Sequence, residues 1–286
     1  MHFRHAAPLA ATAVAVTALI PGAVAGNERV APSTQSVNDS SRIVAPTWKT
    51  FSTATGRGTR IVVSVGGNIT AFTSPNQAGA QYEHIGVGSI GEGYVLCYTG
   101  APATFDLGES SAGFAAPTTT ATAITRNTLD GRASLTQKFS LTPGGTASPT
   151  TFNVTMTVKN RTGAPMTNVI LRRQVDFDID TGGTQGWAGF LSNHSRTKAT
   201  VGAFHDPVEA PAGREAHGIM MMLQSPGGTW DTRVTANILD SSCNPPAAPL
   251  AANFVSRGDY GDTMIFNLGT IGAGASKSSS LRYMRY

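Results

Sequence analysis

The chain has 286 residues, of which only 13% are charged and 32 are glycine, and its formal net charge is +4. Low charge together with many Thr, Val and Gly residues is typical of an extracellular β protein and not of a helical cytosolic enzyme. Basic residues are scattered apart from the pair Arg172 and Arg173, whereas nucleic-acid-binding proteins usually cluster them on one face. Composition therefore predicts no nucleic-acid partner.

The N-terminal segment has the pattern of a secretory signal peptide. Arg4 precedes an apolar run from about Ala10 to Ile20, and Ala23-Val24-Ala25 supplies the small-x-small motif that a signal peptidase cleaves. This run is shorter than the about 20 residues that span a bilayer, and no second apolar segment follows. We therefore expect residues 1–25 to be removed and the protein to be secreted, extracellular or periplasmic, without a membrane anchor.

Residues 26–47 are rich in Ser, Asn and Pro and have no sustained periodicity, which predicts a flexible leader. The remainder, residues 48–286, has a length that fits a single large β domain. Its two cysteines are Cys97 and Cys243. In an exported chain a disulfide is the default for such a pair, and a free, buried Cys97 is the alternative.

Short strands are predicted along the whole domain, separated by Gly, Pro, Asn and Asp. A tight hairpin is indicated around Gly66-Gly67-Asn68. Residues 151–160, "TFNVTMTVKN", alternate strictly between apolar and polar side chains, as a half-buried strand does. The run Met220–Met222 is interpreted as strand core and not as a copper or heme site. The fold class predicted is all-β, an antiparallel two-sheet β-sandwich or a large supersandwich, with few or no helices.

The acidic stretch "RRQVDFDIDTGG", residues 172–183, extends the same alternation. If it pairs as a hairpin with the strand ending near Asn160, the apolar faces of both strands must coincide. Arg172, Gln174, Asp176, Asp178 and Asp180 then share the outward face. Arg173 falls on the apolar side, where an unpaired charge is costly, so it needs a carboxylate partner or a place near the rim. The carboxylates considered for this role are Asp106, Glu92 and Glu109.

Three interpretations of the aspartates remain open: a solvated face with salt bridges, a bound cation, or a ligand site. An EF-hand is rejected, because Thr181 stands where that loop needs glycine and Trp187 where it needs glutamate. Calcium held by Asp178 and Asp180 is the cation considered, since three carboxylates in line on one strand cannot all reach one ion.

Trp187 follows the aspartates in a glycine-rich loop that also contains Gln185. An aromatic ring beside amides and acids is a combination that sugar-binding surfaces use. The alternative is that Trp187 and Phe190 fold back to cap the edge of the sandwich. The candidate ligand-binding residues are therefore Arg172, Asp176, Asp178, Asp180, Gln185 and Trp187.

No catalytic residue is assigned, because no motif singles out a pair of carboxylates for glycoside hydrolysis. The histidines lack the spacing of metal ligands, so no cofactor is predicted apart from the calcium already considered.

The segment "NRTGAPMTNVILRRQVDFDI", residues 160–179, resembles exported bacterial β-sandwich proteins in which an N-x-T-G-x-P turn is followed by an R-R-x-x-D-x-D-I strand. "IGEGYVLCY" and the closing "LGTIGAGASKSSSLRYMRY" are similar to other parts of such proteins. The resemblance implies a β-sandwich but brings no activity, since none is assigned to that family.

The leading hypothesis is a non-catalytic secreted module that binds carbohydrate or another extracellular surface polymer, or has a structural role there. One alternative is a carbohydrate-active enzyme, a glycoside hydrolase or a mutarotase-like protein, that uses acids near Asp176–Asp180. Another is a calcium-stabilised extracellular scaffold. The sequence does not predict an oligomeric state.

Overall fold

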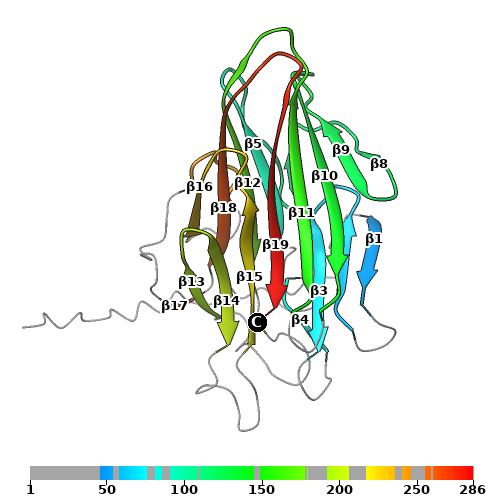
Figure 1. Cartoon of the computed structure of the whole chain (residues 1–286), viewed down its shortest axis with the longest axis vertical. Helices are drawn as coiled ribbons and strands as arrows, with labels where there is room; N and C mark the ends of the chain where they lie inside the picture. Colours follow the sequence, from blue (N-terminus) through cyan, green and yellow to red (C-terminus); the bar gives the residue numbers. More distant parts are fainter. Residues whose placement is uncertain are drawn as a thin grey trace, which may run out of the picture. The chain divides into compact units, whose positions relative to one another are not determined.

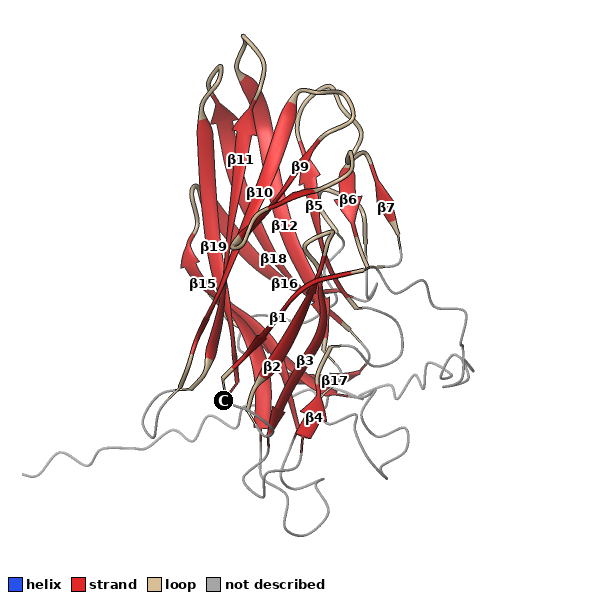
Figure 2. Cartoon of the chain, turned by 90° about the vertical axis from the view of Figure 1, so that its right-hand side faces the viewer, coloured by secondary structure: helices blue, strands red, loops and turns tan. Residues whose placement is uncertain are grey.

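Residues Ser40–Tyr286 form one compact unit in the computed structural model. The structure describes residues 46–53, 58–75, 81–85, 91–108, 110–144, 149–177, 179, 192–205, 217–235, 240–245, 255–258 and 260–285. The predicted signal peptide lies outside these residues, as does the predicted leader up to residue 45. All regular secondary structure in the described ranges is β (Figure 2), and they include no helix of the length and apolarity needed to cross a membrane.

The largest sheet has nine antiparallel strands. In order across the sheet they are β17 (Val255–Gly258), β13 (Ser192–Arg196), β14 (Thr200–His205), β15 (His217–Ser225), β19 (Ser276–Arg285), β11 (Thr151–Asn160), β10 (Ala133–Thr142), β9 (Ala123–Asn127) and β8 (Thr118–Thr119). Its central strands β10, β11 and β19 are ten residues long and pair along their whole length (Figure 1).

A second sheet has six strands and a third has four, again antiparallel. The six-stranded sheet has the order β16 (Thr229–Thr235), β18 (Gly261–Ile271), β12 (Met166–Asp176), β5 (Glu92–Cys97), β6 (Thr104–Asp106) and β7 (Ser111–Ala112). The four-stranded sheet has the order β1 (Thr47–Ser52), β2 (Arg60–Ser64), β3 (Ile69–Pro75) and β4 (Gln81–Glu83).

One continuous hydrophobic core joins all three sheets. It includes Phe72 from the four-stranded sheet, Phe152 from the nine-stranded sheet and Leu171 from the six-stranded sheet, each at most 1% exposed. The aromatic rings of Phe51 on β1 and Phe152 on β11 meet edge to face, with centroids 5.1 Å apart. The predicted antiparallel β-sandwich is confirmed, with two large sheets and a smaller one that shares their core.

The strands on either side of residues 161–165 do not form the hairpin that the sequence suggested. β11 pairs with β10 and β19 in the nine-stranded sheet, whereas β12 pairs with β18 and β5 in the six-stranded sheet. The loop between them therefore carries the chain from one sheet to the other. The apolar faces of β11 and β12 must still coincide, as they would in a hairpin, because two facing sheets point their apolar sides at the same interior.

Side-chain alternation on β12 is as predicted. Val169, Leu171, Val175, Phe177 and Ile179 are all buried in the core, with at most 1% exposure.

On β15 the run of three methionines divides in the same way. Met221 is buried in the core, while Met220 and Met222 are half-buried on the outer side of the sheet. The run therefore lies in a strand, as predicted, and only Met221 belongs to the core, because alternate residues of a strand face opposite sides.

Candidate functional site

Arg173 is fully buried and its guanidinium contacts all three sheets. Its Nε forms an ion pair with Glu92 on β5 and lies 3.2 Å from the hydroxyl of Tyr283 on β19. Nη1 donates to Gln137 Oε1 on β10 at 2.5 Å, and Nη2 donates to the carbonyl of Gly67 at 3.2 Å. The buried charge predicted at Arg173 therefore has a carboxylate partner, Glu92, which was among those considered.

Glu92 is also fully enclosed. Its Oε2 accepts a 2.6 Å hydrogen bond from the Ile69 amide, and its Oε1 accepts the Tyr283 hydroxyl at 2.8 Å. Burial raises the pKa of Glu92, and the charge of Arg173 with these donors opposes the rise. Burial alone would lower the pKa of Arg173, but Glu92 and Tyr283 raise it above its ordinary value.

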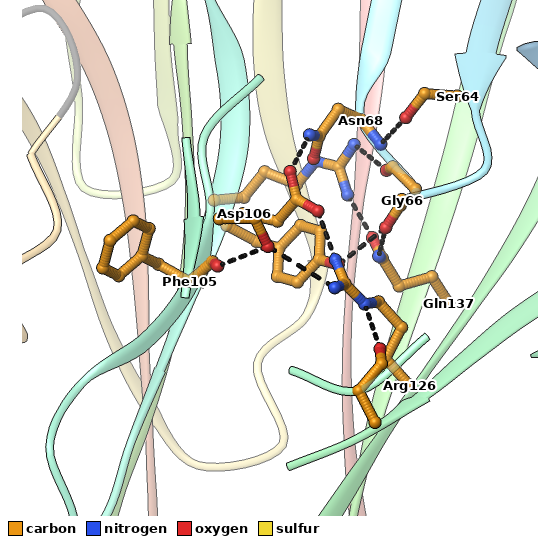
Figure 3. A network of polar contacts seen from close by, with 12 residues as sticks. Ser64, Gly66, Asn68, Phe105, Asp106, Arg126 and Gln137 are labelled. Carbon is orange, nitrogen blue, oxygen red and sulfur yellow. Dashed lines mark hydrogen bonds and ion pairs between the residues drawn. The ribbon is translucent and has the colours of Figure 1, made fainter. Parts of the chain in front are cut away.

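A second buried ion pair joins Asp106 and Arg126 (Figure 3). Asp106 on β6 pairs with Arg126 on β9 through one carboxylate oxygen and with the side-chain amide of Asn68 through the other. The hydroxyl of Tyr94, 3.5 Å from Arg126 Nη1, donates to the carbonyl of Gly66 at 2.6 Å. Arg126 was not predicted to be a buried charge, although its place two residues after the buried Ile124 on β9 puts it on the inward face.

The turn between β2 and β3 joins the two ion pairs. This is the tight hairpin predicted around Gly66-Gly67-Asn68, and β2 and β3 pair as expected. The carbonyl of Gly67 accepts from Arg173, while that of Gly66 accepts from Tyr94 and, at 3.5 Å, from Gln137. The three sheets thus meet at a network that is enclosed in the core and has a structural role.

Gly67→Ala should lower the free energy of unfolding by about 2 kcal/mol or more. Gly67 has φ +96°, a conformation that costs an L-residue about 1 to 2 kcal/mol, and its added Cβ would overlap the side-chain amide of Gln137. Gly163→Ala is the control, because no atom lies within 4 Å of its Cβ position. Urea unfolding measures the free energy of unfolding of both variants. If Gly67→Ala changes it as little as Gly163→Ala does, the turn tolerates a side chain.

The outward side of β12 is not solvated at Arg172 and Gln174, so the interpretation of this side as a solvated face does not hold there. Residues Asp240–Pro245, here called the strap, cover it. Arg172 is fully buried beneath the strap and its guanidinium donates to the carbonyls of Asp240 and Ser242. Gln174 Nε2 also donates to the Asp240 carbonyl, at 3.0 Å. Burial lowers the pKa of Arg172 to about 10. The expectation that Arg172 lies on an open face is therefore wrong, because a segment distant in the sequence takes up its hydrogen bonds.

The strap is held covalently as well. Cys97 on β5 and Cys243 form a disulfide with a sequence separation of 146 residues. Around it Val95, Cys97 and Leu107 form a small hydrophobic cluster on the outer side of the six-stranded sheet, separate from the main core.

A shallow groove of about 220 Å³ opens beside the strap. Ile170 and Ile265 provide apolar lining, and polar groups surround them. The complete lining is Ile170, Thr229, Trp230, Asp231, Arg233, Cys243, Asn244, Ile265 and Asn267. Asp231 and Arg233 form an ion pair at 3.3 Å. The groove is small, and its charged side chains are already paired with each other.

Of the other predicted ligand residues, only Asp176 lies within the described part of the chain. Asp176 ends β12 and is half-buried, and its amide donates to the Gly91 carbonyl at 2.5 Å. Asp178, Asp180, Gln185 and Trp187 lie outside the described residues. Among the described residues, no group of three or more His, Cys, Asp or Glu side chains is placed to hold a metal ion, and the calcium pair Asp178 and Asp180 is not among them.

A buried histidine–carboxylate pair joins the two large sheets. His194 Nδ1 on β13 lies 3.0 Å from Asp262 Oδ2 on β18, and both side chains are at most 1% exposed. The ring of Tyr260 meets the His194 imidazole edge to face, with centroids 5.5 Å apart. Burial raises the pKa of Asp262, and His194 opposes the rise. Enclosure of the pair indicates a role in packing.

The outer side of the nine-stranded sheet is the extended surface on which polar side chains gather. Residues that pair directly in an antiparallel sheet share a face, so the register sorts the outward side chains into rows. One row crosses five strands as Thr118, Thr125, Thr136, Thr157 and Ser278. The adjacent rows are Asn127, Ser134, Lys159 and Ser276 on one side and Ala123, Lys138, Thr155 and Ser280 on the other. We call the outward side of β8, β9, β10, β11 and β19 the hydroxyl face.

Hydrogen bonds between neighbouring strands fix several of these side chains. The hydroxyls of Thr125 and Thr136 lie 2.9 Å apart, and those of Thr157 and Ser278 lie 2.7 Å apart. Further along β11, the amide of Asn153 donates to Thr142 Oγ1 at 3.1 Å. Since one hydroxyl has a donor and two acceptor positions, each paired hydroxyl keeps hydrogen-bonding capacity toward the outside. The alternation of β11 could be predicted from the sequence, but the rows could not, because they depend on the pairing of distant strands.

No protein-family model matches the chain, and no curated protein matches it either. Among solved structures, it is similar to a bacterial glucoamylase complexed with acarbose, with 9% identity and a TM-score of 0.48 over 79% of this chain and 30% of the glucoamylase chain. A galactose mutarotase related enzyme from Lactobacillus acidophilus gives 8% identity and a TM-score of 0.37 over 83% of this chain and 97% of that one. The chain thus spans less than a third of the glucoamylase, and similarities of this degree assign neither a substrate nor an activity to it.

Proposed function

We propose that this protein is a secreted, non-catalytic module that binds an extracellular polysaccharide through the hydroxyl face. The observation that carries the proposal is the row of hydroxyls that crosses five strands, from Thr118 to Ser278, with further polar rows on both sides. A polysaccharide presents many hydroxyl groups along an extended chain, so a regular array of donors and acceptors can bind it at several points.

The disulfide and the extent of the face fit this role. A disulfide between Cys97 and Cys243 is consistent with an oxidising, extracytoplasmic location. From the strand spacing of about 4.8 Å, five paired strands extend over roughly 19 Å between the outermost backbones. By contrast, the groove beside the strap holds only about 220 Å³, which favours the hydroxyl face as the site for a polymer.

The double substitution Thr136→Ala and Thr157→Ala should weaken binding to the polysaccharide that the wild type retains in a pull-down panel. Each change removes a hydroxyl from the central row without altering the core, because both side chains point outward. A loss of about thirtyfold in affinity is expected, since two hydrogen bonds are lost and each contributes roughly 1 kcal/mol. Affinity electrophoresis of the full chain measures it, with thermal unfolding as the check on folding.

Thr229→Ala together with Asn267→Ala is the matched control, because these two exposed residues line the groove beside the strap. If the control variant loses binding and the hydroxyl-face variant keeps it, the groove is the site and our assignment is wrong. Release of reducing sugar by the wild type, abolished in Asp178→Asn, would instead establish the carbohydrate-active enzyme. If the wild type retains no polysaccharide of the pull-down panel, the proposed function is wrong.

A further inference from the structure

We infer that the polysaccharide bound by the hydroxyl face is a linear polyanion, one that carries carboxylate groups at intervals along the chain. This inference rests on the proposed function and specifies its ligand class. It is drawn from the difference in charge between the two large sheets.

None of the residues in the nine strands of the largest sheet is Asp or Glu, whereas the six-stranded sheet contains Glu92, Asp106, Asp176, Asp231 and Asp262. The basic residues of the nine-stranded sheet are Arg126, Lys138, Lys159, Arg196, Arg257, Lys277, Arg282 and Arg285. A ligand on this face therefore meets positive charge without the repulsion that fixed carboxylates would add.

On the hydroxyl face, three of these basic residues point outward by the register: Lys138, Lys159 and Arg282. Both lysines are exposed, and neither has an acidic partner in the part of the chain that the structure describes. Arg282 contacts the sulfur of Met222 at 3.0 Å, while its buried Nε has no hydrogen-bond partner among the described residues. Within the described ranges, all three cations are thus placed without a counter-charge.

The spacing of the three cations favours a polymer over a small anion. Lys138 and Lys159 lie on adjacent strands two rows apart, which places their Cα atoms about 14 Å from each other. Lys138 and Arg282 lie two strands and one row apart, about 12 Å. Lys159 and Arg282 are separated by about 21 Å, so one ligand that contacts all three must extend along the face. Hydroxyls of Thr155, Thr157 and Ser280 lie between the cations, where sugar hydroxyls would bind.

The same face is poorly suited to nucleic acid, the other common polyanion. Single-stranded nucleic acid binds to aromatic side chains on which its bases stack, together with a continuous basic groove. In the rows from Asn127 to Ser280, the outward residues of the described strands include no aromatic side chain. Hydroxyls and isolated cations match a sugar chain with spaced carboxylates better than they match stacked bases.

The test measures binding of the full chain to alginate, a linear polyuronate, over a range of salt concentrations. Lys138→Glu and Lys159→Glu should each weaken binding about fivefold at low salt. Each should also reduce the slope of log affinity against log salt by about one, because one fewer counterion is released. Arg60→Glu is the matched control, since it makes the same charge change at an exposed position of β2, in the four-stranded sheet. It should alter affinity less than twofold.

Neutral dextran and poly-dT serve as the comparison ligands, and each outcome decides the inference. Tighter binding of alginate than of both, lost in the two lysine variants, supports it. Equal effects of Arg60→Glu and Lys138→Glu would overturn it, because net charge alone would then explain binding. Poly-dT bound as tightly as alginate would point to nucleic acid instead. If a neutral polysaccharide binds through Thr136 and Thr157 but alginate does not, the inference fails while the proposed function stands.

Discussion

Glu92→Gln is expected to lower the free energy of unfolding by about 3 to 5 kcal/mol, which is the usual cost of leaving one member of a buried ion pair without its partner. The Arg173 guanidinium would stay in the core with its charge uncompensated, because Gln137 and the Gly67 carbonyl supply only neutral acceptors. In a domain of this size the melting temperature should fall by roughly 6 to 20 °C. Urea unfolding and differential scanning calorimetry measure the two quantities.

Asp231→Asn is the matched control for this substitution. It makes the same carboxylate-to-amide change in the ion pair between Asp231 and Arg233. This pair is partly exposed: 49% of the Asp231 side chain and 23% of the Arg233 side chain are accessible. Exposed pairs typically contribute less than about 1 kcal/mol, so the stability should change little. The double variant Glu92→Leu and Arg173→Met removes both charges and should recover much of the stability lost in Glu92→Gln. A Glu92→Gln variant as stable as wild type would show that the ion pair does not compensate the buried charge.

Removal of the disulfide in the variant Cys97→Ser with Cys243→Ser should lower the free energy of unfolding by about 5 kcal/mol in the chain-entropy model. The effect is large because the bond closes a loop between residues separated by 146 positions, which restricts the unfolded chain strongly. Urea unfolding under oxidising conditions compares this variant with the wild type.

Reducing agent provides the control for the disulfide experiment. It should lower the free energy of unfolding of the wild type toward that of the double variant. The free energy of unfolding of the double variant should not change. Hydrogen exchange should further show faster opening of the strap, because hydrogen bonds alone, from Arg172, Gln174 and Arg233, then hold it. Equal stability of the variant and the oxidised wild type would mean that the strap is retained without its covalent bond.

Local features of the fold could be predicted because successive residues of a strand point to opposite sides whatever the strand pairs with. Alternation alone placed Val169, Leu171 and Val175 in the core and showed that Arg173 would be buried among them. An arginine on the apolar side needed a carboxylate partner or a place near the rim, and the carboxylates considered included Glu92. The β2–β3 hairpin was equally local, since Gly67 supplies a backbone conformation that the turn needs.

The choice among Asp106, Glu92 and Glu109 depended on which strand lies beside β12, and that is settled by packing across the whole domain. β5 is the neighbour of β12, so Glu92 is the partner of Arg173, whereas Asp106 pairs with Arg126 on β9. The hairpin expected between β11 and β12 was wrong for the same reason. Alternation fixes the side to which residues point, but two strands of one sheet and two strands of facing sheets satisfy it equally well.

The candidate site depends still more on tertiary structure. Its rows of hydroxyls arise from the register of β8, β9, β10, β11 and β19, which brings Thr157 beside Ser278, 121 residues later in the chain. The strap that covers Arg172 comes from residues about 70 positions away. The sequence by itself determined which side chains face inward, because that follows from the geometry of each strand. Only the tertiary structure decided which outward face is covered and which is open, because the contacts that cover a face join segments distant in the chain.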